Sequence, residues 1–254
     1  MNRPVLPPLL PLLLLLPGLS FAQDPRQIME EVQKRGRTAS QRYEGSLEVV
    51  SAKNKIVQKR WQYDRIGASG DSKALLRFTT PAEVKGVALL IHNHKDRSSD
   101  QWMWTPALQR DRRIALQDRS TRFFGTDFSF EDLEERDVQQ FEYKLIGEEP
   151  VEGKACWKLE SKPVEAKRSQ YSHTYVWVRK DIYVIARMEA YKGAETIRRI
   201  HYRDIENVKG TWTPRTLEVE AIKEKSRTVL KLDKLDYNLP MKDDDFTLQS
   251  LRRG

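Results

Sequence analysis

The period of the apolar residues constrains the fold of this chain more than any other feature of its sequence. Beyond the first forty or so positions, apolar and polar residues alternate in a series of short segments, as in β-strands with one buried face. Short turn signals such as EGK, KGAE, VKGT and KEKS separate these segments. The expected strands cover residues 43–52, 55–66, 72–80, 86–94, 100–105, 110–116, 141–149, 154–162, 171–180, 183–191, 195–205, 211–222 and 226–237. This spacing predicts an antiparallel meander, and a long twisted meander buries its edges by curling into a barrel or half-barrel.

Few segments favour helices. Residues 25–35 have an apolar stripe, preceded by Asp24 as an N-cap and followed by Gly36 as a stop signal. A second helix is expected over residues 127–137, where acidic residues crowd the first turns. The C-terminal FTLQSL is expected to be a last strand, after a solvated turn of three aspartates.

The N-terminus has the features of a secretory signal peptide. Arg3 gives it a basic start, a leucine and proline run follows, and Ser20-Phe21-Ala22 fits a cleavage site. We therefore expect a signal peptide over residues 1–22, cleavage after Ala22, a single domain over residues 23–254, and a periplasmic protein. An uncleaved N-terminal anchor is the alternative. No cysteine follows the run that could carry a lipid anchor.

Net charge and cysteine content exclude few classes of protein. The formal net charge is +8, and the charges are interspersed, so the surface is mildly basic without a basic tail. The single cysteine, Cys156, permits no intramolecular disulfide, so an exported chain of this kind depends on its core for stability. Cys156 lies in an expected strand, where a buried, inert thiol is the favoured interpretation.

Residues that could carry chemistry are sparse. His92 and His94 share one face of an expected strand and could hold a metal with Asp96, Asp100 or His173 as a third ligand. Polar residues at a strand end are the simpler interpretation, and we expect no metal. The run Asp243-Asp244-Asp245 lacks the glycine and glutamate of a calcium loop. We also expect no cofactor.

Sequence signatures of common enzymes are missing. The chain has no G-x-S-x-G, P-loop, H-E-x-x-H or G-x-G-x-x-G motif. We therefore expect no catalysis, although a lipid hydrolase of another kind remains an alternative. Export and the acidic EDLEERD segment argue against nucleic acid as a partner.

Aromatic and apolar side chains in the expected strands, and in the stretch RSTRFFGTDFSFED (119–132), are the candidates for ligand binding. In an ordinary sandwich they form a core, whereas a curled sheet with an unfilled concave side would use them to line a cavity for an apolar ligand. The candidates are Leu89, Ile91, Trp102, Trp104, Phe123, Phe124, Phe128, Phe130, Tyr175 and Trp177.

The stretch from QWMWTPALQ to FEDLEERD resembles the outer-membrane lipoprotein-sorting family, a group of exported bacterial proteins with a LolA/LolB-like fold. The family pattern is Q-W-x-W/Y-x-P-A-L, then R-R-I, then F-x-G-T/S-D-F-S/T-F/Y-E-D. It is carried here by Gln101, Trp102, Trp104, Pro106, Ala107, Leu108, Arg112, Arg113, Ile114, Phe123, Gly125, Asp127, Phe128, Phe130 and Asp132. Upstream FTTPAEVKGVALL and downstream GTWTP also fit, so the resemblance covers about residues 25–254.

The resemblance implies a mainly β fold, an incomplete antiparallel barrel made of one highly bent sheet with a few covering α-helices. It also implies a periplasmic carrier that accommodates the acyl chains of a lipid or lipoprotein and assists transport towards the outer membrane. We expect the protein to be a monomer. Family members often accompany RND-type exporters, so an inner-membrane RND-type transporter is the expected partner. The alternative is an adaptor subunit that docks on such an exporter and carries no cargo.

Overall fold

The computed structural model describes residues 23–253, so the expected signal peptide at residues 1–22 lies outside the described residues. Its two α-helices are α1 (Pro25–Arg35) and α2 (Leu248–Arg252). The strands are β1 (Ser40–Val50), β2 (Ile56–Ala68), β3 (Asp71–Thr80), β4 (Ala88–Asn93), β5 (Asp100–Thr105), β6 (Arg110–Arg113), β7 (Phe141–Glu148), β8 (Cys156–Pro163), β9 (His173–Arg179), β10 (Ile185–Lys192), β11 (Glu195–Val208), β12 (Thr211–Ala221) and β13 (Ser226–Tyr237).

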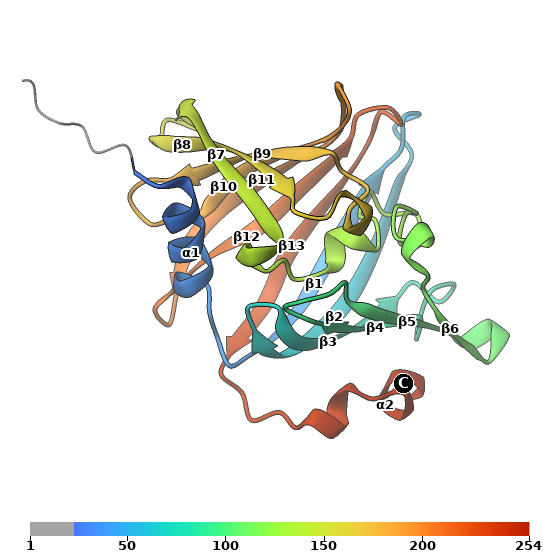
Figure 1. Ribbon diagram of the computed structural model, residues 1–254. Helices are drawn as coiled ribbons and strands as arrows, with labels where there is room; N and C mark the ends of the chain where they lie inside the picture. Colours follow the sequence, from blue (N-terminus) through green and yellow to red (C-terminus); the bar gives the residue numbers. More distant parts are fainter. Residues whose placement is uncertain (1–22, 254) are drawn as a thin grey trace, which may run out of the picture.

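All of these strands belong to one antiparallel sheet. Its order is β6-β5-β4-β3-β2-β1-β13-β12-β11-β10-β9-β8-β7, so β1 pairs with β13 and the sheet ends at β6 and β7. The sheet is strongly bent, and the segment that joins β6 to β7 runs through the space it encloses (Figure 1). The predicted incomplete barrel is therefore confirmed, and each strand expected between residues 43 and 237 is present with boundaries shifted by a few residues.

Helix α1 has the predicted bounds and the predicted caps. The Asp24 side chain accepts a hydrogen bond from the Arg26 backbone N–H at 2.9 Å, and Pro25 occupies the first turn. The helix lies over the concave side of β8–β10 (Figure 1), where Ile28 is fully buried against Leu159 and Val178. Within residues 23–253, no helix is long and apolar enough to cross a membrane.

Two predicted elements are wrong. Residues 127–137 form no α-helix, only a short 3-10 turn at Glu131–Leu133, because side chains of this segment bond to distant strands instead of supporting helical turns. The expected C-terminal strand is instead α2, which begins where Thr247 Oγ1 accepts from the Ser250 backbone N–H at 3.2 Å. It places Leu251 beside Phe246, against the convex face of β4 and β5.

The two faces of the sheet have separate apolar clusters. On the concave side, Leu89 and Ile91 of β4 join a cluster that includes Trp61 of β2. On the convex side, Ala88 and Leu90 of the same strand pack beneath the C-terminal segment. Strand β4 is thus buried on both faces, as its continuous apolar sequence predicts.

Candidate functional site

Phenylalanines of the segment that follows β6 fill the middle of the concave side. We call residues 119–133 the aromatic loop. Phe123 is 0 % exposed and stacks on Phe78 of β3 with ring centroids 5.3 Å apart. Phe128 packs at 6.0 Å from Trp61 of β2, and Phe130 contacts Phe123 edge-to-face. The rings therefore occupy the space that a ligand would need in this part of the half-barrel.

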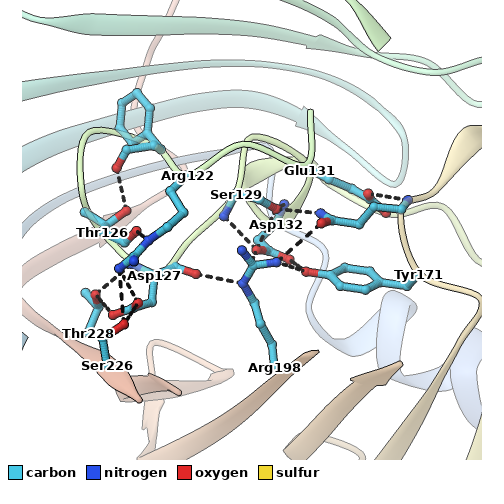
Figure 2. Close-up of polar contacts among 12 residues, drawn as sticks. Arg122, Thr126, Asp127, Ser129, Glu131, Asp132, Tyr171, Arg198, Ser226 and Thr228 are labelled. Atoms are coloured by element: carbon cyan, nitrogen blue, oxygen red, sulfur yellow. Dashed lines mark hydrogen bonds and ion pairs between the residues drawn. The ribbon is translucent and has the colours of Figure 1, made fainter. Parts of the chain in front are cut away.

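A buried carboxylate fixes the start of the aromatic loop to the sheet. Asp127 is 0 % exposed and accepts hydrogen bonds from Ser226 Oγ at 2.6 Å and Thr228 Oγ1 at 2.7 Å, both on β13. The Asp127 backbone N–H donates to Thr228 Oγ1 at 2.8 Å, and Arg122 forms an ion pair with the carboxylate (Figure 2). Each polar atom of Asp127 therefore has a partner, which is the condition for burying a charge.

A second buried carboxylate fixes the end of the loop. Asp132 accepts from the Ser129 backbone N–H and from the Tyr171 hydroxyl, both at 2.7 Å. Arg198 of β11 forms an ion pair with Asp132 at 3.4 Å and donates from Nε to the Asp127 carbonyl at 2.8 Å (Figure 2). Burial raises the pKa of the Tyr171 hydroxyl well above its usual value. The network holds the loop against β11 and the segment before β9.

An apolar cavity lies elsewhere, between α1 and the concave face of the strands near the β7 edge. Its volume is about 250 Å³. The wall is formed mainly by apolar side chains from the helix, from the segment before β7 and from β7–β10: Met29, Val32, Val138, Phe141, Tyr143, Val176, Ile185 and Met188. A smaller cavity of about 180 Å³ lies on the other side of α1 and shares Val32, Gly36 and Ile185 with the first.

Helix α1 forms one wall of both cavities and has few polar attachments to the sheet. Arg26 Nη2 donates to the Phe141 carbonyl at 3.0 Å. Gln33 accepts from the Val138 backbone N–H at 3.0 Å and donates to Asp137 at 3.3 Å. The other attachments are the apolar stripe centred on Ile28 and the contacts of Arg26 and Arg35 with the rings of Tyr143 and Tyr183. The helix therefore covers the sheet without filling the space beneath it.

Polar groups gather at one end of the larger cavity. Gln33, Arg37, Glu135 and Arg136 contribute to its lining. Burial would lower the pKa of Arg136, but the neighbouring carboxylates Glu131 and Asp132 outweigh this and raise it. Burial also raises the pKa of the Tyr143 hydroxyl, so this group is neutral at physiological pH. An amphipathic ligand with its chain in the cavity would therefore meet charged side chains as well as apolar ones.

The residues predicted to bind ligand occupy three other places. Leu89, Ile91, Phe123, Phe128 and Phe130 are buried in the main core, with Phe124 packed against it. Trp102 and Trp104 lie on the convex face under Phe246. Tyr175 and Trp177 lie on the convex face beside Cys156. None of the ten lines the apolar cavity beneath α1, and their contact with a ligand stays a prediction.

The sequence contained a signal for the cavity. Met29 and Val32 belong to the apolar stripe predicted for α1, and Val176 alternates with the two aromatic residues that were chosen on β9. The aromatic candidates of β9 face the convex side. The smaller aliphatic residues of the opposite face line the cavity.

The candidate metal residues have other partners. His92 Nε2 lies 3.0 Å from the Phe246 carbonyl, and His94 Nε2 lies 3.1 Å from Asp100. The aspartate run forms a 3-10 turn in which Asp245 accepts from the Lys242 backbone N–H. Over residues 23–253, no group of three or more histidine, cysteine, aspartate or glutamate side chains could hold a metal ion. Cys156 is a free, buried thiol, and burial raises its pKa.

Comparison with known proteins gives the relatives of this architecture. A family model described as an uncharacterized protein matches residues 70–253. The chain is similar to the structure of a domain assigned as an outer membrane lipoprotein-sorting protein from Vibrio parahaemolyticus, with 23% identity, 90% of this chain and 98% of that chain covered, and a TM-score of 0.86. It is also similar to a DUF1329 family protein from Desulfovibrio piger, with 26% identity, coverage of 89% and 97%, and a TM-score of 0.85.

A third structure extends the comparison. A LolA superfamily protein from Nitrosomonas europaea shares 17% identity with the chain over 89% of this chain and 98% of that one, with a TM-score of 0.72. No curated protein matches the chain. The fold is therefore LolA-like, which confirms the resemblance found in the sequence.

Proposed function

The chain belongs to the family whose model, described as an uncharacterized protein, matches residues 70–253, and we propose that it is an exported carrier that binds acyl chains of a lipid or lipoprotein in the apolar cavity beneath α1. The observation that carries this proposal is the cavity of about 250 Å³ between a loosely attached amphipathic helix and an aliphatic sheet face. Each methylene buried there contributes roughly 0.8 kcal/mol. Binding of this kind needs no catalytic group.

The setting of the carrier is part of the proposal. The signal features of residues 1–22 support export to the periplasm, and the LolA-like fold supports a role in moving lipid or lipoprotein towards the outer membrane. We place an RND-type transporter of the inner membrane as the partner, and we assign the carrier no catalytic activity. Resemblance to the lipoprotein-sorting family motivates the transporter.

The size of the cavity favours a second candidate, an adaptor that docks on the exporter without cargo. Sites for small ligands usually measure about 300–1,000 Å³, and the larger cavity is below that range. A carrier must therefore bind a single chain or move α1 outwards, whereas an adaptor need do neither.

The first experiment is native mass spectrometry of protein purified from a native periplasm, followed by organic extraction. Lipid that is released on denaturation supports the carrier. Protein that is empty and takes up neither lipid nor detergent supports the adaptor.

A substitution then tests the location of the site. Val32→Trp places an indole in the cavity from α1, and we expect it to weaken binding of a fluorescent fatty acid by about tenfold or more, since the chain and the indole compete for one space. Glu30→Trp is the matched control, because Glu30 is exposed on the same helix. Equal binding by both variants and the natural protein would remove the cavity from the proposal.

A further inference from the structure

A polar cleft of about 860 Å³ adjoins the apolar cavity and has no role in the fold described so far. It lies among the β10–β11 and β12–β13 turns, the segment before β9 and the first residues of the aromatic loop. Five cationic side chains line it against two acidic ones; the cations are Arg119, Lys167, Arg168, Lys192 and Lys223, and the acids are Glu131 and Glu195. The cleft is thus a concave surface of positive charge, which concentrates anions.

Two of the cations in this cleft have partners, since Arg168 pairs with Glu165 and Arg119 with Glu134. The three lysines do not. Lys167, Lys192 and Lys223 form no ion pair or hydrogen bond with any side chain of residues 23–253, whereas most cations of β8–β13 are paired. Arg119 is only 5 % exposed; Nη1 pairs with Glu134 at 3.0 Å and Nη2 donates to the Ser99 carbonyl, but Nε has no hydrogen-bond partner within the same residues. A buried guanidinium N–H without a partner is rare in folded proteins and indicates a missing acceptor.

One ion pair separates the cleft from the apolar cavity. Glu131 lines the cleft, Arg136 lines the cavity, and their side chains meet at 3.4 Å. The Arg136 guanidinium also lies 5.7 Å from the ring centroid of Tyr171, which lines the cleft. The Glu131 carboxylate is paired with Arg136 and accepts a hydrogen bond from the Gln170 backbone N–H at 2.8 Å. Its negative charge is therefore neutralised locally and repels an anion in the cleft less.

We propose that the cleft binds the phosphate group of an anionic ligand, and that in the carrier this group is the headgroup of the lipid whose chain lies beneath α1. Only the assignment of the phosphate to a lipid headgroup rests on the proposed function; the phosphate site itself does not. Phosphate matches the donor set because lysine ammonium and arginine guanidinium groups are its usual partners in proteins. A diacylglycerol, which lacks phosphate, would use the cavity alone.

The test compares three probes by calorimetry on the mature protein: short-chain phosphatidylglycerol, the diacylglycerol with the same chains, and glycerol phosphate. We expect phosphatidylglycerol to bind more tightly than either of the others and its affinity to fall with salt, because exposed charges are screened. The Lys167→Glu, Lys192→Glu, Lys223→Glu variant should lose about tenfold or more in phosphatidylglycerol affinity. Its affinity for the diacylglycerol should not change.

The matched control reverses the same number of charges elsewhere. Lys53, Lys55 and Lys85 are exposed, have no ion pair within residues 23–253, and lie outside the cleft, so Lys53→Glu, Lys55→Glu, Lys85→Glu changes the net charge equally. Equal losses in both triple variants would mean attraction by net charge and would overturn the cleft. Equal affinity of the natural protein for phosphatidylglycerol and diacylglycerol would also overturn it, while leaving the carrier intact. Binding of glycerol phosphate alone, abolished in the cleft variant, would keep the phosphate site, assign it to a soluble ligand and remove the lipid carrier.

Discussion

The aromatic loop and α1 cover the same concave face of the sheet, but the loop fills the space against it and the helix leaves cavities. The loop inserts Phe123, Phe128 and Phe130, all at most 4 % exposed, and is fixed by two buried carboxylates. Helix α1 inserts only Ile28 completely and leaves cavities on both of its sides. Large rings fill the irregular surface of a bent sheet, whereas a straight amphipathic helix contacts it along one line.

This difference assigns the stability of the sheet mainly to the aromatic loop and the space for a ligand to the region beneath α1. The loop holds together β1–β4 and β11–β13 through the main core. Helix α1 excludes water from an aliphatic surface without occupying it, and its attachments are a few hydrogen bonds to residues 137–141. If the comparison is right, substitutions in the loop change mainly the free energy of unfolding, and substitutions in the helix change mainly the cavity.

The largest expected effect is that of Phe123→Ala. The substitution leaves a hole between Phe78, Phe124 and Phe130, so we expect the free energy of unfolding to fall by about 3–5 kcal/mol. Chemical denaturation measures it. Leu116→Ala is the control, since Leu116 is 56 % exposed and should change stability by less than about 0.5 kcal/mol. A loss near 1 kcal/mol for Phe123→Ala would mean that the loop does not fill the core.

The next effect is a pH dependence at the end of the loop. Burial raises the pKa of Glu134 to about 7, in spite of Arg119 at 3.0 Å. Because its pKa is higher in the folded than in the unfolded state, the Glu134 carboxyl binds its proton more tightly when the protein is folded. The stability that this contributes is fully present below about pH 4.5 and is lost as the pH rises towards 7. The loss is up to about 3 kcal/mol.

Glu134→Gln removes this titration. Denaturation midpoints of the variant should vary less between pH 4.5 and 7 than those of the natural protein, and Gln101 can still donate to the new side chain. Glu148→Gln is the control, because Glu148 is exposed at the edge strand β7. Parallel pH profiles of Glu134→Gln and the natural protein would show that Glu134 titrates normally.

A smaller effect is expected for Asp127→Asn. The amide keeps the shape of the side chain, but it removes the charge that pairs with Arg122 and one acceptor for Ser226 and Thr228. We expect a loss of about 2 kcal/mol, and faster hydrogen exchange of the amides in residues 121–132. Asp64→Asn, on a half-exposed surface pair with Arg42, is the control and should lose at most about 1 kcal/mol. Unchanged exchange in the loop would show that the aromatic rings fix it without the carboxylate.

The strands and α1 could be predicted from the sequence because their signals are local. Alternation at period two, turn residues and the Asp24 cap act within a few positions, and the elements formed where they were expected. The loop and the C-terminus could not be predicted in this way. Residues 127–137 have the composition of a helix, but Asp127 bonds to β13, about a hundred positions away. Residues 248–252 form a helix, capped by Thr247, that covers β4 and β5.

The candidate site was harder to predict than the fold. Alternation separates the two faces of a strand but does not say which face is concave, so Trp177 and Val176 could not be ranked by pattern alone. In the structure, Trp177 lies on the convex face between Lys158 and Arg187, with its ring centroid 4.7 and 4.5 Å from their charged groups. Val176 lines the cavity with α1, a helix more than a hundred positions away. The bend of the sheet decides which of the two residues faces the cavity beneath α1.

The smallest effect on stability belongs to α1. Arg26→Ala removes the hydrogen bond to the Phe141 carbonyl and the contact with the Tyr143 ring at 5.9 Å, and we expect a loss of about 1 kcal/mol. Amide hydrogen exchange should quicken in α1 and stay unchanged in the aromatic loop, because the two coverings share no side-chain partner of Arg26. Gln27→Ala is the control, since Gln27 is exposed on the same helix. If the variant also takes up a fluorescent fatty acid faster, the helix opens to admit the chain; if exchange quickens equally in the loop, the two coverings are one cooperative unit and the comparison fails.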